Sequence, residues 1–317
     1  MSRFQIRHIT RYVYDNMVRD SANQIMLYPP ADQSQEIVKH TITITGEPAV
    51  STHIDYFGNR VGTFTHPNPH NELSIDSQLI VITYSRPVPD DSMAAEEQWA
   101  QLPNLKYQVD FLDYLKQEQF PSLDDVKLLT KSERHSHYTP FVAAKHLCEY
   151  VYKNFTYQKG ITTVETTMEE VWKLKSGVCQ DFAHMLLVML RLMDIPARYV
   201  SGYICPNKSG MRGEGATHAW VEAYMPNFGW LGLDPTNNCI VDDTHVRLAV
   251  GKNFSDCSPV RGTYRGTSDH TMEVSVAVSY EDGHVVADEN VVVEPATPST
   301  SVYKNSFQRY QEMQMQQ

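Results

Sequence analysis

At residues 176–184 the chain reads Ser176-Gly177-Val178-Cys179-Gln180-Asp181-Phe182-Ala183-His184. A glycine-containing turn here leads into a run that is apolar on most sides, which predicts a buried helix over residues 179–193 that ends at Ile195-Pro196. Cys179 would then lie in the first turn of this helix, where unpaired backbone N–H groups and the positive end of the dipole favour a thiolate. A cysteine that opens a helix is by itself a weak sign of function, because most cysteines are small buried side chains.

A strand that begins with a histidine follows this helix in the sequence. It reads Thr217-His218-Ala219-Trp220-Val221-Glu222-Ala223-Tyr224-Met225, and alternation places His218, Trp220, Glu222 and Tyr224 on one face. This face combines polar and aromatic side chains, as the wall of a cleft would. Glu222, like Asp181, could line that cleft or simply satisfy polar partners, and the second reading is preferred. A histidine at the start of a strand is usually structural, so this face also needs support.

The third segment supplies an acid. Gly229-Trp230-Leu231-Gly232-Leu233-Asp234-Pro235-Thr236 follows a turn at residues 226–229, which predicts an antiparallel hairpin with the histidine strand. If Tyr224 lies opposite Trp230, then Trp220 lies opposite Asp234. His218 is then the diagonal neighbour of Asp234, within reach of a hydrogen bond. The ordinary alternative for Asp234 is the start of a turn before Pro235.

Together these segments predict a catalytic triad. Cys179 would be the nucleophile, His218 the base that takes the thiol proton, and Asp234 the acid that orients the imidazole ring. The backbone N–H of Cys179 is one expected oxyanion donor. No second donor is assigned: Tyr157 and Trp172 could approach the site, but packing in the core is the preferred interpretation of each.

The rest of the chain falls into three regions. Residues 1–88 contain several short alternating strands separated by turn formers, which predicts an N-terminal β-sandwich. A proline-rich linker at residues 86–91 leads into an α+β region over residues 89–280, with further helices predicted at 93–102, 109–119, 139–154 and 167–174. Residues 271–280 and 285–293 predict a hairpin. A C-terminal region over 281–317 would hold the second strand of this hairpin and a poorly ordered tail beyond Pro295.

Composition narrows the class of protein. The 317 residues are 41% hydrophobic and 21% charged, close to the average of soluble globular proteins, and the formal net charge of −11 argues against nucleic acid or an anionic membrane as partner. The first eight residues hold no apolar leader and residues 185–190 are too short a run to span a bilayer, which favours a cytoplasmic protein.

The sequence predicts neither a cofactor nor a metal ion. Five cysteines without a CxxC pair fit neither a zinc site nor a disulfide framework, and no phosphate loop or EF-hand pattern occurs. The pair of histidines in His135-Ser136-His137 has no evident third ligand and is interpreted as a solvated loop. The glycine-containing loop from Cys205 to Ala216 is interpreted as a border of the substrate groove.

The three segments together resemble the signature blocks of the bacterial transglutaminase-like family, within the papain-like cysteine protease and transglutaminase superfamily. Tyr12-Val13-Tyr14 and Asp55-Tyr56-Phe57-Gly58-Asn59 resemble the β-rich region that precedes the catalytic domain in this family. The resemblance covers roughly residues 1–280. It implies a papain-like α+β core, with the cysteine-bearing helix packed on an antiparallel sheet, and thiol acyl chemistry on amides. By the same resemblance Cys179, His218 and Asp234 carry over as the triad.

Three functions remain open from the sequence. The leading one is hydrolysis of a peptide or glutamine amide through a thioester on Cys179, as in a cysteine peptidase or amidase. The second is transfer of the acyl group to an amine, as in a transglutaminase, with an identical triad. The third is a non-catalytic peptide-binding protein built on the same fold. Residues 251–256 depart from the Gly-Arg-Asp-Tyr that relatives usually show, which suggests a changed cleft lining. The expected partner is a protein or peptide substrate, and the oligomeric state is not indicated.

Overall fold

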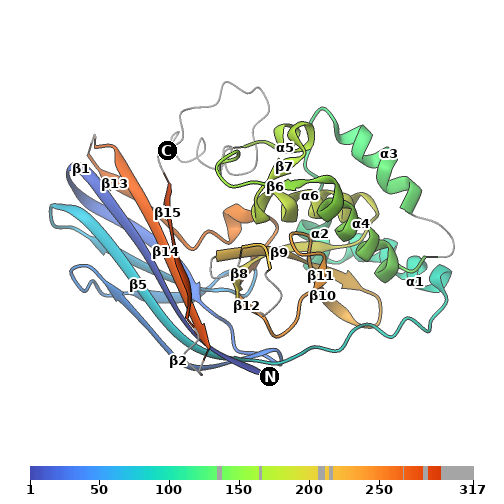
Figure 1. Cartoon of the computed structure of the whole chain (residues 1–317), viewed down its shortest axis with the longest axis horizontal. Coiled ribbons are helices and arrows are strands. Elements are labelled where there is room, and N and C mark those ends of the chain that lie inside the picture. Colours follow the sequence, from blue (N-terminus) through green and yellow to red (C-terminus); the bar gives the residue numbers. More distant parts are fainter. Residues whose placement is uncertain are drawn as a thin grey trace.

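The computed structural model describes residues 1–133, 138–163, 166–205, 211–213, 217–266, 268–280 and 285–293. Figure 1 shows a large curled sheet on one side of the molecule and a smaller sheet covered by helices on the other. The α+β fold class is therefore confirmed. Within the described residues, no helix is long and apolar enough to cross a membrane.

The large sheet is organised around one long strand, β1 (Ser2–Tyr28). Its first half pairs with β5 (His70–Thr83) and β14 (His270–Tyr280), and its second half pairs with β4 (Arg60–His66) and β13 (Val260–Arg265). Three further strands complete it: β2 (Gln35–Ile44), β3 (Ser51–Ile54) and β15 (Val285–Val293). The register of β1 shifts between Val13 and Val18 and again between Arg19 and Ala22, and such irregularities bend a strand. The sheet curls around a core that includes Phe4, Ile25 and Leu73.

This arrangement refines the predicted sandwich in two ways. Within the described residues, the eight strands form one curled sheet instead of two separate layers. In addition, β13 and β14 lie in the N-terminal sheet, although the sequence division had placed them with the catalytic region at 89–280. Alternation predicts that a segment is a strand but not which partner it finds. The boundaries at 88 and 280 stay predictions. The hairpin of β14 and β15 is confirmed, and the tail beyond Pro295 lies outside the described residues.

Helices precede the strands of the smaller sheet in the sequence. They are α1 (Ala95–Gln101), the 3₁₀ helix η1 (Leu102–Tyr107), α2 (Val109–Leu115), α3 (Leu123–Glu133), α4 (Pro140–Asn154), α5 (Met168–Leu174) and α6 (Cys179–Leu192). Thr139 caps α4 by accepting a hydrogen bond from the Val142 N–H, as the sequence predicted for a helix that starts with proline. Helix α3 was not predicted: among its side chains that the structure describes, only Val126 and Thr130 are buried, so its sequence carries little helical periodicity.

The smaller sheet carries the order β11-β10-β9-β8-β12. Its strands are β8 (Ala197–Ile204), β9 (Thr217–Met225), β10 (Gly229–Asp234), β11 (Cys239–Ile240) and β12 (His245–Gly251). On one face the small apolar side chains of β9, such as Val221 and Ala223, share a core with α6. On the other face Tyr203 and Val246 pack into the core of the curled sheet. The expected packing of the cysteine-bearing helix on an antiparallel sheet is confirmed, and Figure 1 shows it between α6 and β9.

Candidate active site

Cys179 opens helix α6, as the sequence predicted, and it is partly exposed. The turn before it is held in place by two short parallel strands, β6 (Thr156–Tyr157) and β7 (Ser176–Gly177). Asp181 then closes the turn, because its Oδ2 accepts hydrogen bonds from the Val178 N–H at 2.8 Å and from Thr162 Oγ1 at 2.7 Å. A side chain at Gly177 would overlap with this carboxylate. The local sequence therefore fixes where the thiol begins the helix.

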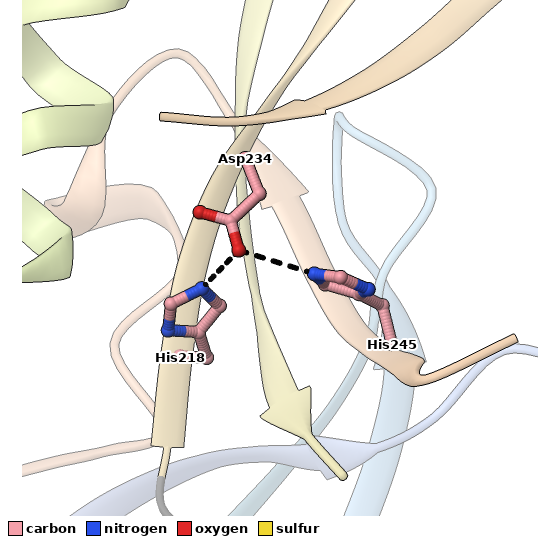
Figure 2. Close-up of side chains that lie close together, drawn as sticks. All are labelled: His218, Asp234 and His245. Carbon is pink, nitrogen blue, oxygen red and sulfur yellow. Dashed lines mark hydrogen bonds and ion pairs between the residues drawn. The ribbon is translucent and has the colours of Figure 1, made fainter. Parts of the chain in front are cut away.

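His218 and Asp234 are brought together by the hairpin of β9 and β10. Trp230 pairs with Tyr224 and Leu233 with Val221, which is the predicted register and sets Asp234 opposite Trp220. The His218 Nε2–H donates to Asp234 Oδ2 over 2.8 Å, drawn as a dashed line in Figure 2. Neither side chain is exposed to solvent. The diagonal contact expected from the sequence is therefore present.

Asp234 also forms the turn that the alternative interpretation expected. Its Oδ1 accepts from the Thr236 N–H at 2.8 Å and from the Asn237 N–H at 3.3 Å. Its Oδ2 accepts from Asn237 Nδ2 at 2.7 Å besides His218. Burial alone would raise the pKa of Asp234, but hydrogen bonds and positive charge from His218, with a further hydrogen bond from His245, hold that pKa below its usual range. One carboxylate thus shapes the turn and binds the ring.

The electrostatics of His218 follow from these partners. Burial lowers the pKa of His218, but the Asp234 carboxylate outweighs burial and, with a smaller effect from Cys179, raises this pKa to about 10. Among the described residues, His218 Nδ1 has no hydrogen-bond partner, and Figure 2 shows it on the part of the ring away from Asp234. The Cys179 thiol therefore lies near enough to the ring to interact with it.

Gly213 lies beside Nδ1 of His218. A methyl group at Gly213, where φ is +76°, would lie 3.4 Å from His218 Nδ1 and 3.6 Å from the Tyr157 hydroxyl. Tyr157, one of the two candidates for a second oxyanion donor, thus reaches the neighbourhood of the site. Trp172, the other candidate, stacks on the core near Phe155, with ring centroids 6.3 Å apart. Of the loop between Cys205 and Ala216, residues 206–210 and 214–216 lie outside the described residues.

The polar and aromatic face of β9 does not form the wall of a cleft, contrary to the interpretation of its sequence. Trp220 and Glu222 are 1% exposed, and Arg86 of the linker lies 3.8 Å from Glu222. Glu222 accepts a hydrogen bond from Arg198 at 2.8 Å and another from Arg247 at 3.2 Å. Burial would raise the pKa of Glu222, but these arginines hold it below its usual range. The preferred reading of Glu222 and Asp181 as side chains satisfied by polar partners is confirmed.

Two other segments of the sequence also find their place. Residues 251–256, which depart from the usual sequence of the family, pack against α6. The Phe254 N–H donates to His184 Nε2 at 3.1 Å, and the Phe254 ring meets Tyr199 edge to face. His135 and His137 lie outside the described residues.

His245 was missed by the sequence analysis. Its Nε2 lies 3.3 Å from Asp234 Oδ2, the same oxygen that His218 contacts, as Figure 2 shows. The signal for it was poor, because β12 pairs with β8 and not with the hairpin. In the part of the chain that the structure describes, His218, Asp234 and His245 form the group whose ligand atoms, all within 4.8 Å, could hold a metal ion. Both rings already lie at hydrogen-bond distance from one carboxylate oxygen, so hydrogen bonds account for the cluster without a metal.

Comparisons with known proteins agree with this architecture. Residues 129–235 match the model of the transglutaminase-like superfamily, and residues 4–82 match that of the bacterial transglutaminase-like N-terminal region. An uncharacterized protein of Mycobacterium tuberculosis is 34% identical over 294 residues, which cover 87% of this chain and 92% of the relative. A protein-glutamine gamma-glutamyltransferase of Pseudomonas aeruginosa is 33% identical over 87 residues, which cover 26% of this chain and 13% of that protein.

A solved structure extends the likeness to the whole fold. The crystal structure of a candidate cysteine protease from Cytophaga hutchinsonii superposes with a TM-score of 0.69 at 18% identity, and the match covers 96% of each chain. This likeness shows the fold, and the sequence relatives show the family. The chain belongs to the transglutaminase-like superfamily and carries the N-terminal region of its bacterial members.

Proposed function

We propose that this protein performs thiol-dependent acyl chemistry on peptide or glutamine amides, and that water completes the reaction. Cys179 is the nucleophile, His218 the proton acceptor and donor, and Asp234 the residue that orients the ring. The observation that carries the proposal is the buried hydrogen bond of 2.8 Å between His218 and Asp234, next to a cysteine at a helix N-terminus. Three residues of this kind in this order have the logic of a catalytic triad.

In the proposed reaction the Cys179 proton is held on His218 Nδ1, so that a thiolate faces an imidazolium. The thiolate attacks the amide carbonyl carbon, and the Cys179 N–H, one of the first N–H groups of α6, donates to the developing oxyanion. The tetrahedral intermediate collapses as the C–N bond breaks and Nδ1 gives its proton to the departing amine. A thioester of Cys179 remains. Water then attacks the thioester and gives a proton to His218, the C–S bond breaks, and the acid leaves with the thiolate and the imidazolium restored.

Access of water supports hydrolysis as the second half of the reaction. Cys179 is partly exposed, so a thioester on it would be open to attack by water. The alternative is acyl transfer to an amine, which the similarity of part of the chain to a protein-glutamine gamma-glutamyltransferase favours. Both reactions pass through the same thioester, so the second nucleophile alone separates them.

One incubation distinguishes the two reactions. The full chain is mixed with a glutamine-containing protein and a labelled primary amine, and both label incorporation and the masses of the products are followed. Hydrolysis predicts new peptide termini or a gain of about one mass unit per deamidated glutamine, without incorporated label. Incorporation of the amine would establish transfer instead. We expect Cys179→Ala to abolish either product, because no other group supplies the nucleophile.

A second cysteine of this chain provides an internal control for the thiol. Cys239 is also partly exposed, but burial raises its pKa to about 12, so it stays a thiol at neutral pH. Iodoacetamide at pH 7 is therefore expected to alkylate Cys179 well before Cys239, as measured by peptide mass spectrometry. If no amide product forms and iodoacetamide does not prefer Cys179, the enzymatic proposal is wrong.

A further inference from the structure

We propose that His245 is a positioning residue for this site, which holds the Asp234 carboxylate in the orientation that serves His218. The inference rests on the proposed function, since it concerns the same triad. His245 Nε2 lies 3.3 Å from Asp234 Oδ2, and its side chain is 1% exposed. Figure 2 shows His218 and His245 approaching the carboxylate from two different sides. His245 is thus a buried polar side chain directed at the acid of the triad.

The hydrogen bonds of His245 define which nitrogen carries its proton. An ionised carboxylate can only accept, so the Nε2–H of His245 must donate to Asp234. The other nitrogen, Nδ1, lies 3.1 Å from the Thr244 hydroxyl, which can donate to it. Burial lowers the pKa of His245, and nearby His218 lowers it further, so the ring is neutral. A neutral ring with one donor and one acceptor matches both partners, which leaves no polar atom of His245 without a role.

Three donors converge on one oxygen of the acid. Asp234 Oδ2 accepts from His218 at 2.8 Å, from Asn237 Nδ2 at 2.7 Å and from His245 at 3.3 Å. The rings of Trp220 and His245 also pack in a T-shaped arrangement, with centroids 5.2 Å apart and planes at 78°. A carboxylate with donors on several sides cannot rotate without breaking a buried hydrogen bond. Removal of His245 frees one side of Asp234 and lets the oxygen move away from His218.

The backbone that carries His245 is held by the N-terminal sheet. Gln35 binds the free edge of β12 with both ends of its amide: Oε1 accepts from the Arg247 N–H at 2.8 Å and Nε2 donates to the Arg247 carbonyl at 2.9 Å. Asn59 repeats the pattern at Val250, with distances of 2.8 and 2.7 Å. Through the backbone of β12, His245 therefore connects the N-terminal sheet to the acid of the triad.

The experiment measures alkylation of Cys179 by iodoacetamide at pH 7 in the full chain, by mass spectrometry of the Cys179 peptide. His245→Leu puts an apolar side chain of comparable bulk in place of the ring and removes the donor. His245→Gln keeps an N–H donor. Asp234→Asn serves as the reference for a lost acid. The matched control is His8→Leu, because His8 is equally buried and donates or accepts at Tyr203 Oη over 2.9 Å, away from Asp234.

We expect His245→Leu to slow alkylation about tenfold, the effect of one lost hydrogen bond to a charged group. His245→Gln should stay within about threefold of the natural chain, and His8→Leu should leave the rate unchanged while it lowers the melting temperature. Asp234→Asn should slow the reaction by more than His245→Leu. A purely structural role of His245 would lower the melting temperature of both His245 variants without rescue by glutamine.

Several outcomes overturn the inference, and they differ from those that overturn the proposed function. The positioning role is excluded, while the triad stands, if Cys179 is alkylated in His245→Leu at the rate of the natural chain. It is also excluded if His245→Gln slows alkylation as much as His245→Leu does. An unchanged rate in Asp234→Asn means that Asp234 does not act on His218, and both proposals fall. If the expected order of rates is found but no amide is processed, the positioning role is supported and the amide chemistry is not.

Discussion

Asp234 is contacted by two strands that are held in different ways. Strand β9 reaches it through a tight hairpin, in which only 16 residues separate His218 from the acid. Strand β12 lies at the opposite edge of the sheet, and its own free edge is bound by Gln35, which is 212 residues away from Arg247 in the sequence. One side of the acid is therefore set by local geometry, and the other depends on the N-terminal sheet.

The two histidines on these strands also differ in charge. Both are buried and both contact Asp234 Oδ2, and burial lowers the pKa of each. The carboxylate raises the pKa of His218 to about 10, but it does not prevent the pKa of His245 from falling below its usual value. The contact with His218 is shorter, at 2.8 Å against 3.3 Å, and the charge on His218 opposes a second proton. One buried carboxylate thus supports one imidazolium.

The largest expected effect follows from this difference and concerns the free energy of unfolding as a function of pH. His218 binds a proton more tightly in the folded state, so its contribution to stability is present below about pH 6.5 and is lost as pH rises towards 10. Between those limits the loss is about 1.4 kcal/mol per pH unit. We expect His218→Gln to remove this slope, as measured by urea unfolding at a series of pH values.

The control for this measurement is a histidine with the opposite behaviour. Burial lowers the pKa of His8 to about 4, so His8 contributes stability that is present above about pH 6.5 and is lost as pH falls towards 4. His8→Gln should therefore change the pH dependence of the free energy of unfolding only on the acid side. If the free energy of unfolding has the same pH slope above pH 6.5 in the natural chain and in His218→Gln, Asp234 does not keep His218 protonated.

The hairpin side of the site could be predicted from the sequence. A turn of fixed length at residues 226–229 sets Tyr224 opposite Trp230, and period-two alternation then places His218 and Asp234 on one face. The start of α6 at Cys179 was equally local, because a glycine turn and a buried helix meet there. Interactions between neighbours in the sequence leave a pattern that can be read.

The β12 side could not be predicted in the same way. His245 reaches Asp234 only because β12 pairs with β8 and is bound by side chains of the N-terminal sheet, and none of these partners is a neighbour in the sequence. For the same reason, alternation identified β14 as a strand but not its pairing with β1. Arg86, which pairs with Glu222 on β9, likewise comes from the distant linker, so this partner could not be read from the sequence.

Gly202 lies between β9 and β12, and its substitution should have the next largest effect on the free energy of unfolding. On β8 it pairs with His218 of β9 and with Arg247 of β12. A methyl group here would overlap with the Val246 carbonyl oxygen and lie 2.5 Å from the Trp220 ring. We expect Gly202→Ala to lower the free energy of unfolding by about 3 kcal/mol, because neither neighbour can yield without moving its strand.

The neighbouring position Ser201 offers a control for Gly202. Ser201→Ala changes a buried side chain on the same strand without adding bulk, and it should cost less than about 1 kcal/mol. Urea unfolding of both variants gives the comparison. Similar stability of Gly202→Ala and the natural chain would mean that β9 and β12 are packed less tightly against β8 than the distances indicate.

The smallest effect is expected from the amide that binds β12. Gln35→Ala removes both hydrogen bonds to Arg247 and leaves that backbone unit without its partner, at a cost of about 2 kcal/mol in the free energy of unfolding. Because β12 carries His245, alkylation of Cys179 should also slow, by about threefold. The slowing is smaller than for His245→Leu, since Asn59 still holds the strand at Val250.

Gln98 separates the loss of stability from the effect on the site. It is a buried glutamine whose Nε2 donates to Asp91 Oδ1 at 3.1 Å and to the Met93 carbonyl at 3.0 Å, both before helix α1 and away from β12. Gln98→Ala should lower stability by a similar amount and leave the alkylation of Cys179 unchanged. If the two variants slow alkylation equally, the N-terminal sheet supports only the stability of the chain. If Gln35→Ala alone slows it, the sheet also sets the geometry around Asp234, through a strand that the hairpin does not control.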